Sequence, residues 1–342
     1  MRDAGGGAVI LRLHPAPPAM TRALVLASLL AATAAAQPAT LADYVPADAE
    51  LETLATGFGW SEGPVWRPAH GDLLFSDVPG NTVYRWAEGD GLSVFLRPSG
   101  LAVGAGRDAS VGSNGLLLDA EGRLLLADHG SRAVTRLDTA AYVRTALATE
   151  YDGRRLNSPN DLALHASGAL FFTDPPYGLA GQDGSPEKEL PFNGVYRLDP
   201  DGAVTLLVDS LSRPNGVVLS PDERTLYIAN SDPERAVWLA YPLRDDGTVG
   251  AGRVLLDATD WVGPDRPGLP DGMAVAEDGA LFATGPGGVW IITPDGRHIG
   301  TIETDRAVAN VTFGDDGRTL YLTAHDTLQR VRVLARGAGF AE

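Results

Sequence analysis

The segment GALFFTD (168–174) contains a tight-turn residue, an apolar strand and a closing polar residue, and this pattern recurs along the chain. Five further copies keep the same order of positions: GDLLFSD (71–77), GRLLLAD (122–128), RTLYIAN (224–230), GALFATG (279–285) and RTLYLTA (318–324). Their aligned leucines are Leu73, Leu124, Leu170, Leu226, Leu281 and Leu320. Successive leucines lie 39 to 56 residues apart, a period typical of a propeller or a solenoid.

The residues around each copy indicate how many strands one unit holds. Most copies follow an Asp-Gly-type turn, such as AEDG (276–279), and another short apolar run precedes that turn. Two apolar runs joined in this way indicate a β-hairpin. Further strand-like segments follow, for example NTVYRW (81–86) and GVWIITP (288–294), so that each unit holds about four short strands. We therefore predict an all-β protein that forms a six-bladed β-propeller.

The ends of the repeat region predict how the ring closes. The last unit lacks an outermost strand, while AELETLATGF (49–58) is a spare strand ahead of the first unit. We expect this N-terminal strand to complete the final blade, which removes an exposed sheet edge. One segment, TAAYVRTALATEY (139–151), fits a helix or an outer strand about equally well. The propeller domain is expected to span residues 49–335, with a C-terminal tail at 336–342.

Composition limits the classes of partner and of chemistry. The 342 residues carry a formal net charge of −17 and no basic cluster, which argues against a nucleic-acid partner. The chain contains no cysteine, which excludes disulfides, thiolate metal sites and a cysteine nucleophile. Any bound metal must therefore be held by oxygen or by one of the six histidines.

The N-terminal residues resemble a targeting segment. MTRALVLASLLAATAAAQPA (20–39) contains a charged arginine, a short apolar run and the small residues that a signal peptidase needs. The apolar run is too short to span a bilayer. We predict a signal peptide within residues 1–36, with Met1 or Met20 as the translation start, and a linker at 37–48. A periplasmic or secreted protein without a membrane anchor, monomeric or weakly oligomeric, is expected.

An oxygen-bearing side chain precedes each aligned leucine by ten or eleven residues. These side chains are Glu62, Asn114, Asn160, Asn215, Asp271 and Asn310. Because the first strand of each propeller blade lines the central channel, we expect the six positions to converge near the axis. Carboxylates and amides without His or Cys suit a hard cation, Ca²⁺ first, with Zn²⁺, Mn²⁺ and Mg²⁺ as the other candidates.

A simpler explanation of these polar residues is that Asn and Asp favour turns and strand starts. This explanation accounts for one or two of these residues, but not for six at the same position of the repeat. It remains an alternative for Asn114 and Asn310. The predicted metal ligands are Glu62, Asn160, Asn215 and Asp271.

The segment GWSEG (59–63) also matches the G-x-S-x-G pattern of a serine hydrolase. A nucleophile elbow needs a strand, a sharp turn and then a helix beneath the serine. Here the chain continues as GPVWRPAHGDLLFSD (63–77), a proline followed by a strand and a hairpin. We therefore interpret Ser61 as a bystander and its neighbour Glu62 as the functional residue.

At these residues the chain resembles the senescence marker protein / gluconolactonase / luciferin-regenerating enzyme family, in particular its bacterial gluconolactonase-like members. The similar motifs cover roughly residues 50–334 in family order. They include SEGPVW (61–66), RLNSPNDLALHASGALFFTDPPYGL (155–179), RPNGVVLSPDERTLYIANSD (213–232) and PDGMAVAEDG (270–279). The combination of EGP, FTDPPYG and RPNG is much more specific than any one of them alone.

The resemblance implies a six-bladed propeller with one divalent cation, usually calcium, in its channel. By position, Glu62, Asn215 and Asp271 match the family's metal ligands, and Asn160 matches an asparagine that contacts metal or substrate. Asp271 also matches the proposed catalytic proton acceptor. A basic substrate-binding residue of the animal members is replaced by Ser158, and Glu189 is only a loose counterpart of their sugar-contacting acid.

The expected activity is opening of sugar lactones, such as glucono-1,5-lactone, by a metal-dependent hydrolase. Asp271 would accept a proton from water or attack the carbonyl directly, and we favour a role in positioning metal-activated water. His129 either relays protons or is a strand-end histidine without a role. The predicted contacts to the substrate are Asn114, Asn160, Asp161, Tyr177 and Glu189.

Two other functions fit the same sequence features. One keeps the metal and changes the substrate, giving an arylesterase or an organophosphate hydrolase. The other is a non-catalytic, ligand-binding propeller in which calcium is purely structural.

Overall fold

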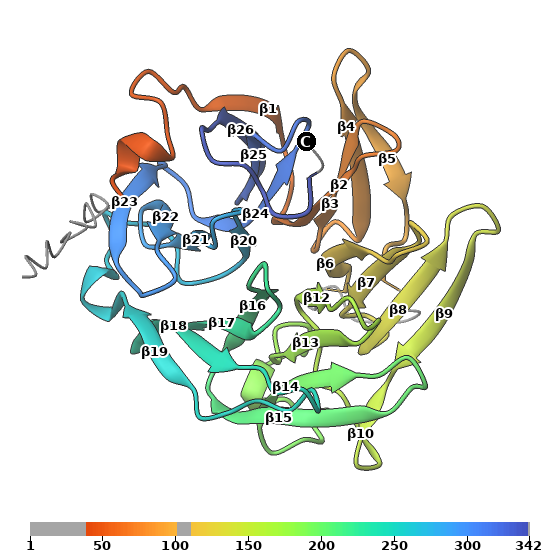
Figure 1. Ribbon diagram of the computed structural model, residues 1–342. Coiled ribbons are helices and arrows are strands. Elements are labelled where there is room, and N and C mark those ends of the chain that lie inside the picture. Colours follow the sequence, from red (N-terminus) through yellow and green to blue (C-terminus); the bar gives the residue numbers. More distant parts are fainter. Residues whose placement is uncertain (1–38, 101–110, 341–342) are drawn as a thin grey trace, which may run out of the picture. The chain divides into compact units, whose positions relative to one another are not determined.

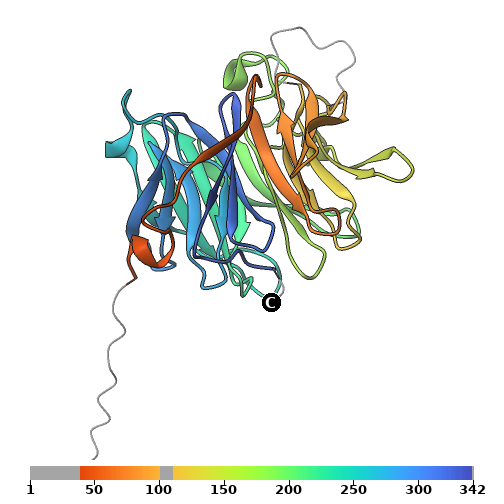
Figure 2. The same ribbon diagram turned by 90° about the horizontal axis from the view of Figure 1, so that it is seen from above.

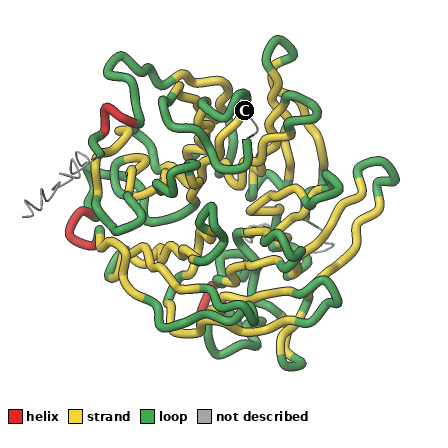
Figure 3. Tube along the Cα trace, in the orientation of Figure 1, coloured by secondary structure: helices red, strands yellow, loops and turns green. Residues whose placement is uncertain are grey.

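The computed structural model describes residues 39–100 and 111–340 of the chain. Within these residues, six four-stranded antiparallel sheets surround a central axis (Figure 1), which confirms the six-bladed β-propeller. The remaining regular structure is a two-stranded hairpin and three one-turn 3₁₀ helices, the red segments of Figure 3. No helix in the described part of the chain is long and apolar enough to cross a membrane. The predicted signal peptide lies outside the described residues.

Blades 1 to 5 each run from the innermost to the outermost strand in chain order, and blade 6 takes its outermost strand from the N-terminal part of the chain. Blade 1 contains β2 (Ser61–Arg67), β3 (Asp72–Asp77), β4 (Thr82–Ala87) and β5 (Gly91–Leu96). Blade 2 contains β6 (Ser113–Leu118), β7 (Leu124–Asp128), β8 (Ala133–Asp138) and β9 (Val143–Ala148). Blade 3 contains β12 (Leu162–Leu164), β13 (Leu170–Asp174), β14 (Asn193–Leu198) and β15 (Val204–Leu211).

The second half of the ring repeats this order. Blade 4 contains β16 (Pro214–Leu219), β17 (Thr225–Asp232), β18 (Arg235–Pro242) and β19 (Arg253–Asp257). Blade 5 contains β20 (Met273–Val275), β21 (Leu281–Gly285), β22 (Gly288–Ile292) and β23 (His298–Glu303). Blade 6 contains β24 (Val308–Gly314), β25 (Thr319–Ala324), β26 (Thr327–Arg332) and, from the other end of the chain, β1 (Glu52–Thr56).

Closure of the ring by an N-terminal strand is confirmed. β1 pairs antiparallel with β26, from Glu52 opposite Arg330 to Thr56 opposite Thr327, and it forms the outer strand of blade 6. Figure 2, turned by 90°, shows the blades edge-on. The segment at 139–151 is resolved in favour of a strand, because β9 forms the outer edge of blade 2.

Segments outside the blades pack onto the propeller. Of the predicted linker, residues 39–48 are described, and they include η1 (Leu41–Asp43). Tyr44 is buried there, and its hydroxyl donates a 2.6 Å hydrogen bond to Asp278. Blade 3 carries an insertion with η2 (Gln182–Gly184), and the hairpin β10 (Glu150–Tyr151) and β11 (Arg154–Arg155) precedes this blade. η3 (Thr259–Trp261) follows β19 in blade 4.

The hydrophobic core is divided into six clusters, one between each pair of neighbouring blades. Aromatic rings span several of these interfaces. The ring centres of Trp238 and Trp290 are 5.2 Å apart across blades 4 and 5, and those of Phe282 and Phe313 are 5.1 Å apart across blades 5 and 6. Because every blade is packed on both faces, strands such as β3, β7 and β13 are buried along their whole length.

The innermost strands approach one another most closely next to the predicted oxygen donors. Four of the six donors are followed by glycine, and the missing side chain leaves room for the neighbouring blade. A Cβ on Gly63 or Gly216 would collide with the carbonyl oxygen of Asn114 or Asp271, respectively. Gly63 also has a φ of +49°, a conformation that glycine adopts without strain.

We predict that Gly216→Ala destabilises the propeller, because the new methyl group would push blade 5 away from blade 4. Overpacking of this kind costs about 2 kcal/mol of unfolding free energy. Gly184→Ala is the matched control, because a Cβ at Gly184 meets nothing within 4 Å. Denaturant unfolding of both variants checks the prediction, and equal midpoints for the two would contradict it.

Candidate active site

The predicted donors all lie at one end of the innermost strands. Glu62, Asn114, Asn215 and Asn310 lie within the first residues of β2, β6, β16 and β24. Asn160 and Asp271 each lie two residues before the strand that follows, β12 and β20 respectively. The strand pairing becomes irregular beside the four that lie in strands. Such bulges redirect side chains, and here they occur beside donors that line or adjoin the channel.

A cavity of about 520 Å³ opens at this end of the channel. Seven of the predicted site residues line it: Glu62, Asn114, His129, Asn160, Tyr177, Asn215 and Asp271. Glu62, Asn114, Asn160 and Asn215 are each at most 6% exposed. Asp271 keeps partial access to solvent. The structure therefore brings all four predicted metal ligands to one cavity, although they come from blades 1, 3, 4 and 5.

The two carboxylates at this cavity are electrostatically strained. Burial raises the pKa of Glu62, and the charge of Asp161 adds to this effect. Burial and then the charge of Glu62 raise the pKa of Asp271 well above its usual range. Both shifts mean that hydrogen bonds and charges of the protein do not fully offset the cost of ionising the two carboxylates. A cation bound between the two carboxylates would supply it.

The asparagines at the cavity present oxygen atoms. The Asn215 Nδ2 donates a 2.9 Å hydrogen bond to the Ser231 hydroxyl, which leaves its carbonyl oxygen as the group available to a ligand. Ser231 in turn donates to the Pro270 carbonyl, next to Asp271. The buried Oδ1 of Asn114 has no hydrogen-bond partner in the described structure. An unpaired buried acceptor of this kind is costly unless a ligand or water satisfies it.

The donor set is the main test of whether a metal ion fits. Among the described residues, no three His, Asp or Glu side chains form a group that could hold one. The cavity instead combines two carboxylates, Glu62 and Asp271, with the amides of Asn160 and Asn215. An all-oxygen set with two negative charges fits Ca²⁺, which accepts amide oxygens and completes its shell with water. It does not resemble the nitrogen- and sulfur-rich sites of zinc.

Ser61 occupies a structural position. Its side chain is fully buried, and its hydroxyl donates to the carbonyls of Thr327 (2.8 Å) and His325 (3.1 Å). These bonds join blade 1 to blade 6, and no helix follows the serine. The geometry agrees with the interpretation of Ser61 as a bystander.

Two of the predicted substrate contacts lie elsewhere. Asp161 is buried beside the channel, where its carboxylate accepts hydrogen bonds from the N–H groups of Leu162 (2.9 Å) and Val217 (3.2 Å). It lines a different cavity from the one that holds Asn160. Glu189 is exposed on the blade 3 insertion, where it accepts a bond from the Arg155 N–H. Its side chain is not among those lining the active-site cavity.

Two further predicted residues, His129 and Tyr177, lie in the cavity wall. His129 follows β7 and is buried. Burial raises the pKa of Tyr177, and the charge of Asp271 adds to this effect. The side chains of Ser231 and Asn215 act in the opposite direction and lower the pKa of Tyr177. Ser158 is not among the residues that line this cavity; it is buried, and its hydroxyl donates a 2.6 Å bond to the Pro175 carbonyl.

Several wall residues were not predicted from the sequence. Trp60 and Ser231 line the cavity, and so does the loop that contributes Val262, Arg266 and Leu269. The loop belongs to the connection between blades 4 and 5 and lies outside the aligned strand motifs, so the repeat alignment gave it no position. A signal for Ser231 was present, because it directly follows the polar residue that ends the strand motif RTLYIAN.

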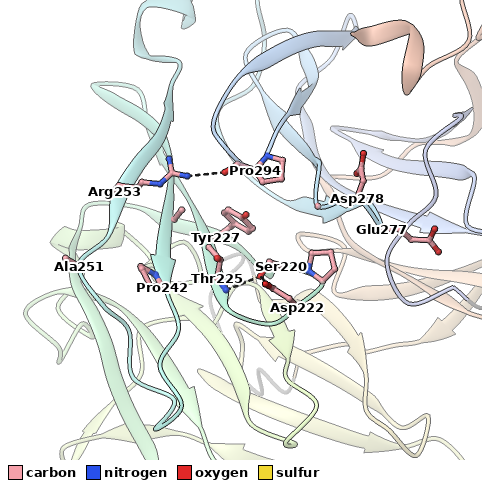
Figure 4. Close-up of a pocket in the computed structure, with 13 residues that line it drawn as sticks. Ser220, Asp222, Thr225, Tyr227, Pro242, Ala251, Arg253, Glu277, Asp278 and Pro294 are labelled. Atoms are coloured by element: carbon pink, nitrogen blue, oxygen red, sulfur yellow. Dashed lines mark hydrogen bonds between the residues drawn. The ribbon is translucent and has the colours of Figure 1, made fainter. Parts of the chain in front are cut away.

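A second cavity, of about 470 Å³, lies between blades 4 and 5 (Figure 4). Its walls come from the β16–β17 turn, the β20–β21 turn and the ends of β18 and β19. Arg253 donates a 3.1 Å bond to the Pro294 carbonyl there, and Thr225 donates a backbone bond to Ser220. None of the predicted site residues lines this cavity.

Comparisons with known proteins agree with this geometry. The family model for the SMP-30/Gluconolactonase/LRE-like region matches residues 60–326. A gluconolactonase of Zymomonas mobilis is 42% identical over 292 residues, covering 84% of this chain and 82% of that protein. The structure of a gluconolactonase from Xanthomonas campestris has a TM-score of 0.73 at 35% identity and covers 86% of this chain and 92% of that one.

A calcium-binding regucalcin from Agrobacterium tumefaciens shares the fold, with a TM-score of 0.65 at 21% identity over 86% of this chain and 97% of that one. The family match extends over most of the propeller and includes all four predicted metal ligands. The chain belongs to the SMP-30/gluconolactonase/LRE family.

Proposed function

We propose that this protein hydrolyses sugar lactones such as glucono-1,5-lactone in the 520 Å³ cavity, with the help of one divalent cation, calcium first. One observation carries the metal part of the proposal. The carboxylates of Glu62, which is buried, and Asp271, which is partly exposed, share a cavity with asparagine oxygens. The pKa values of both carboxylates are raised, and no positively charged side chain is among the groups that shift them. The lactone part is supported by the 42% identity to a gluconolactonase.

The proposed ligands of the cation are Glu62, Asn160, Asn215 and Asp271. When bound, a divalent cation would polarise the lactone carbonyl and stabilise the charge that develops on its oxygen. Support for calcium comes from the oxygen-only donor set and from a calcium-binding relative of the same fold.

The chain's own residues would orient water and substrate. Asp271, which is partly open to the cavity, would position the attacking water and take up its proton. The water oxygen bonds to the lactone carbonyl carbon, the ring C–O bond breaks, and the ring oxygen takes up that proton and becomes a hydroxyl group of the aldonic acid. His129, in the cavity wall, would move a proton, while Asn114, Asn160 and Tyr177 would bind sugar hydroxyls.

The first experiment measures hydrolysis of glucono-1,5-lactone before and after chelation and after calcium is added back. Loss of activity with the chelator and recovery with calcium are expected.

Asp271→Asn should lower kcat/KM about 100-fold or more. Asp222→Asn, in the cavity of Figure 4, is the matched control and should stay within about twofold. Activity that survives exhaustive chelation would refute the metal, and turnover of aryl esters alone would favour the arylesterase.

Calcium binding can be tested without turnover. The raised pKa values of Glu62 and Asp271 mean that protons compete with the cation as the pH falls. We expect calorimetry to show weaker calcium binding at about pH 5.5 than at about pH 7.5, with proton release on binding. Glu62→Gln should weaken binding and reduce its pH dependence. Equal affinity of the wild type at both pH values would contradict this assignment.

Ser231 is expected to act as a positioning residue. Ser231→Ala removes the group that holds the Asn215 amide and the Pro270 carbonyl, and should weaken calcium binding about tenfold. Ser220→Ala, at the far turn of the same hairpin, is the control. Calorimetry and thermal unfolding of both variants separate weaker binding from misfolding. Unchanged calcium affinity in Ser231→Ala would remove this role.

A further inference from the structure

Arg266 is an unusual residue in the active-site cavity. Among the described residues that line the cavity, it is the one side chain with a permanent positive charge. It belongs to the loop between η3 and β20, whose residues Val262, Pro267 and Leu269 form an apolar part of the wall. The floor carries the opposite charge, from Glu62 and Asp271.

Other arginines near the mouth already have partners. Arg213 is paired with Asp183, and Arg306 is paired with Asp326. The Arg132 guanidinium donates to the carbonyls of Leu156 (2.7 Å) and Glu187 (2.9 Å).

Arg266 differs from these three arginines. In the part of the chain that the structure describes, its guanidinium forms neither an ion pair nor a hydrogen bond. Its charge and its five N–H donors are therefore available to a ligand.

The loop holds this guanidinium in place by stacking. The Arg266 Cζ lies 4.3 Å from the centre of the Trp261 ring. Trp261 in turn packs edge-on against Trp290 (5.1 Å) and His298 (5.8 Å) of blade 5. A guanidinium over an aromatic face keeps the donors at its edge free, and it loses less freedom when it binds a planar or tetrahedral anion. The Arg266 guanidinium is thus held against an aromatic ring on the cavity wall.

We propose that Arg266 makes the site selective for lactones that carry an anionic group outside the ring, a carboxylate or a phosphate. This inference rests on the proposed lactone hydrolysis. The lactone carbonyl faces the proposed cation site at Glu62 and Asp271, so a substituent on the far side of the ring points toward Arg266 in the cavity wall. The two N–H edges of the guanidinium pair with two oxygens of the anion.

Two matched substrate pairs test the proposal. D-glucaro-1,4-lactone and D-glucono-1,4-lactone differ by a carboxylate in place of a hydroxymethyl group. 6-Phospho-D-glucono-1,5-lactone and D-glucono-1,5-lactone differ by a phosphate. We expect the wild type to have the higher kcat/KM for the anionic member of at least one pair, and the pair that responds identifies the anion. Added salt should reduce the preference, because Arg266 is exposed.

Variants assign the preference to Arg266. Arg266→Gln should lower the ratio of anionic to neutral kcat/KM about tenfold, mainly through KM, and Arg266→Lys should restore part of it. Arg306→Gln is the matched control, because this rim arginine already has a partner in Asp326 and should leave the ratio unchanged. Thermal unfolding checks that all variants are folded.

The outcomes separate this inference from the proposed function. Hydrolysis of the neutral lactones with no preference for either anionic partner would overturn the role of Arg266 and leave lactone hydrolysis intact. A preference that survives in Arg266→Gln would also overturn it. No hydrolysis of any of the four lactones would refute the proposed function and this inference together.

Discussion

The close approach of the innermost strands at the axis is the constraint on which the site depends. A donor side chain in one blade is followed by glycine, and the neighbouring blade fills the space beside that glycine. Gly115 shows the fit, since its N–H donates a 2.7 Å bond to the Asn160 carbonyl and a Cβ there would lie 2.7 Å from the same oxygen. The blades can therefore converge far enough for the charge of Glu62 to raise the pKa of Asp271.

Blade 3 meets the same constraint differently. Asp161 stands where most other blades have glycine, and its carboxylate accepts the Val217 N–H of blade 4. It thus replaces a close backbone contact with a bridging side chain. Burial raises its pKa to about 6, and its charge raises the pKa values of Glu62 and Asp271 further. Asp161 influences the site through charge, although it does not line the cavity.

The fold and the donor ring were predictable because both follow from periodicity. The repeat fixes which strand is innermost, and the same phase places Glu62, Asn114 and Asp271 at one end of that strand. The repeat gave a position for Ser231, next to a strand motif, but not its role, which depends on hydrogen bonds to Asn215 and Pro270. Arg266 lies in the connection between blades 4 and 5, outside the aligned repeat segments. The predicted substrate contact at Glu189 was based on a loose family resemblance within an insertion. In an insertion, the position of a residue in the sequence does not tell whether its side chain faces the cavity.

The interface between blades 1 and 6 makes assembly of the site depend on the order in which the chain is synthesised. β1 is synthesised early and finds its partner β26 only when almost the whole chain exists. Ser61, one residue before Glu62, bonds to Thr327 of that same late strand. The ring is therefore fastened by contacts of very high sequence separation, which form slowly. The surroundings of Glu62 are complete only when the last blade has packed against the first, so an incomplete chain would have no functional cavity.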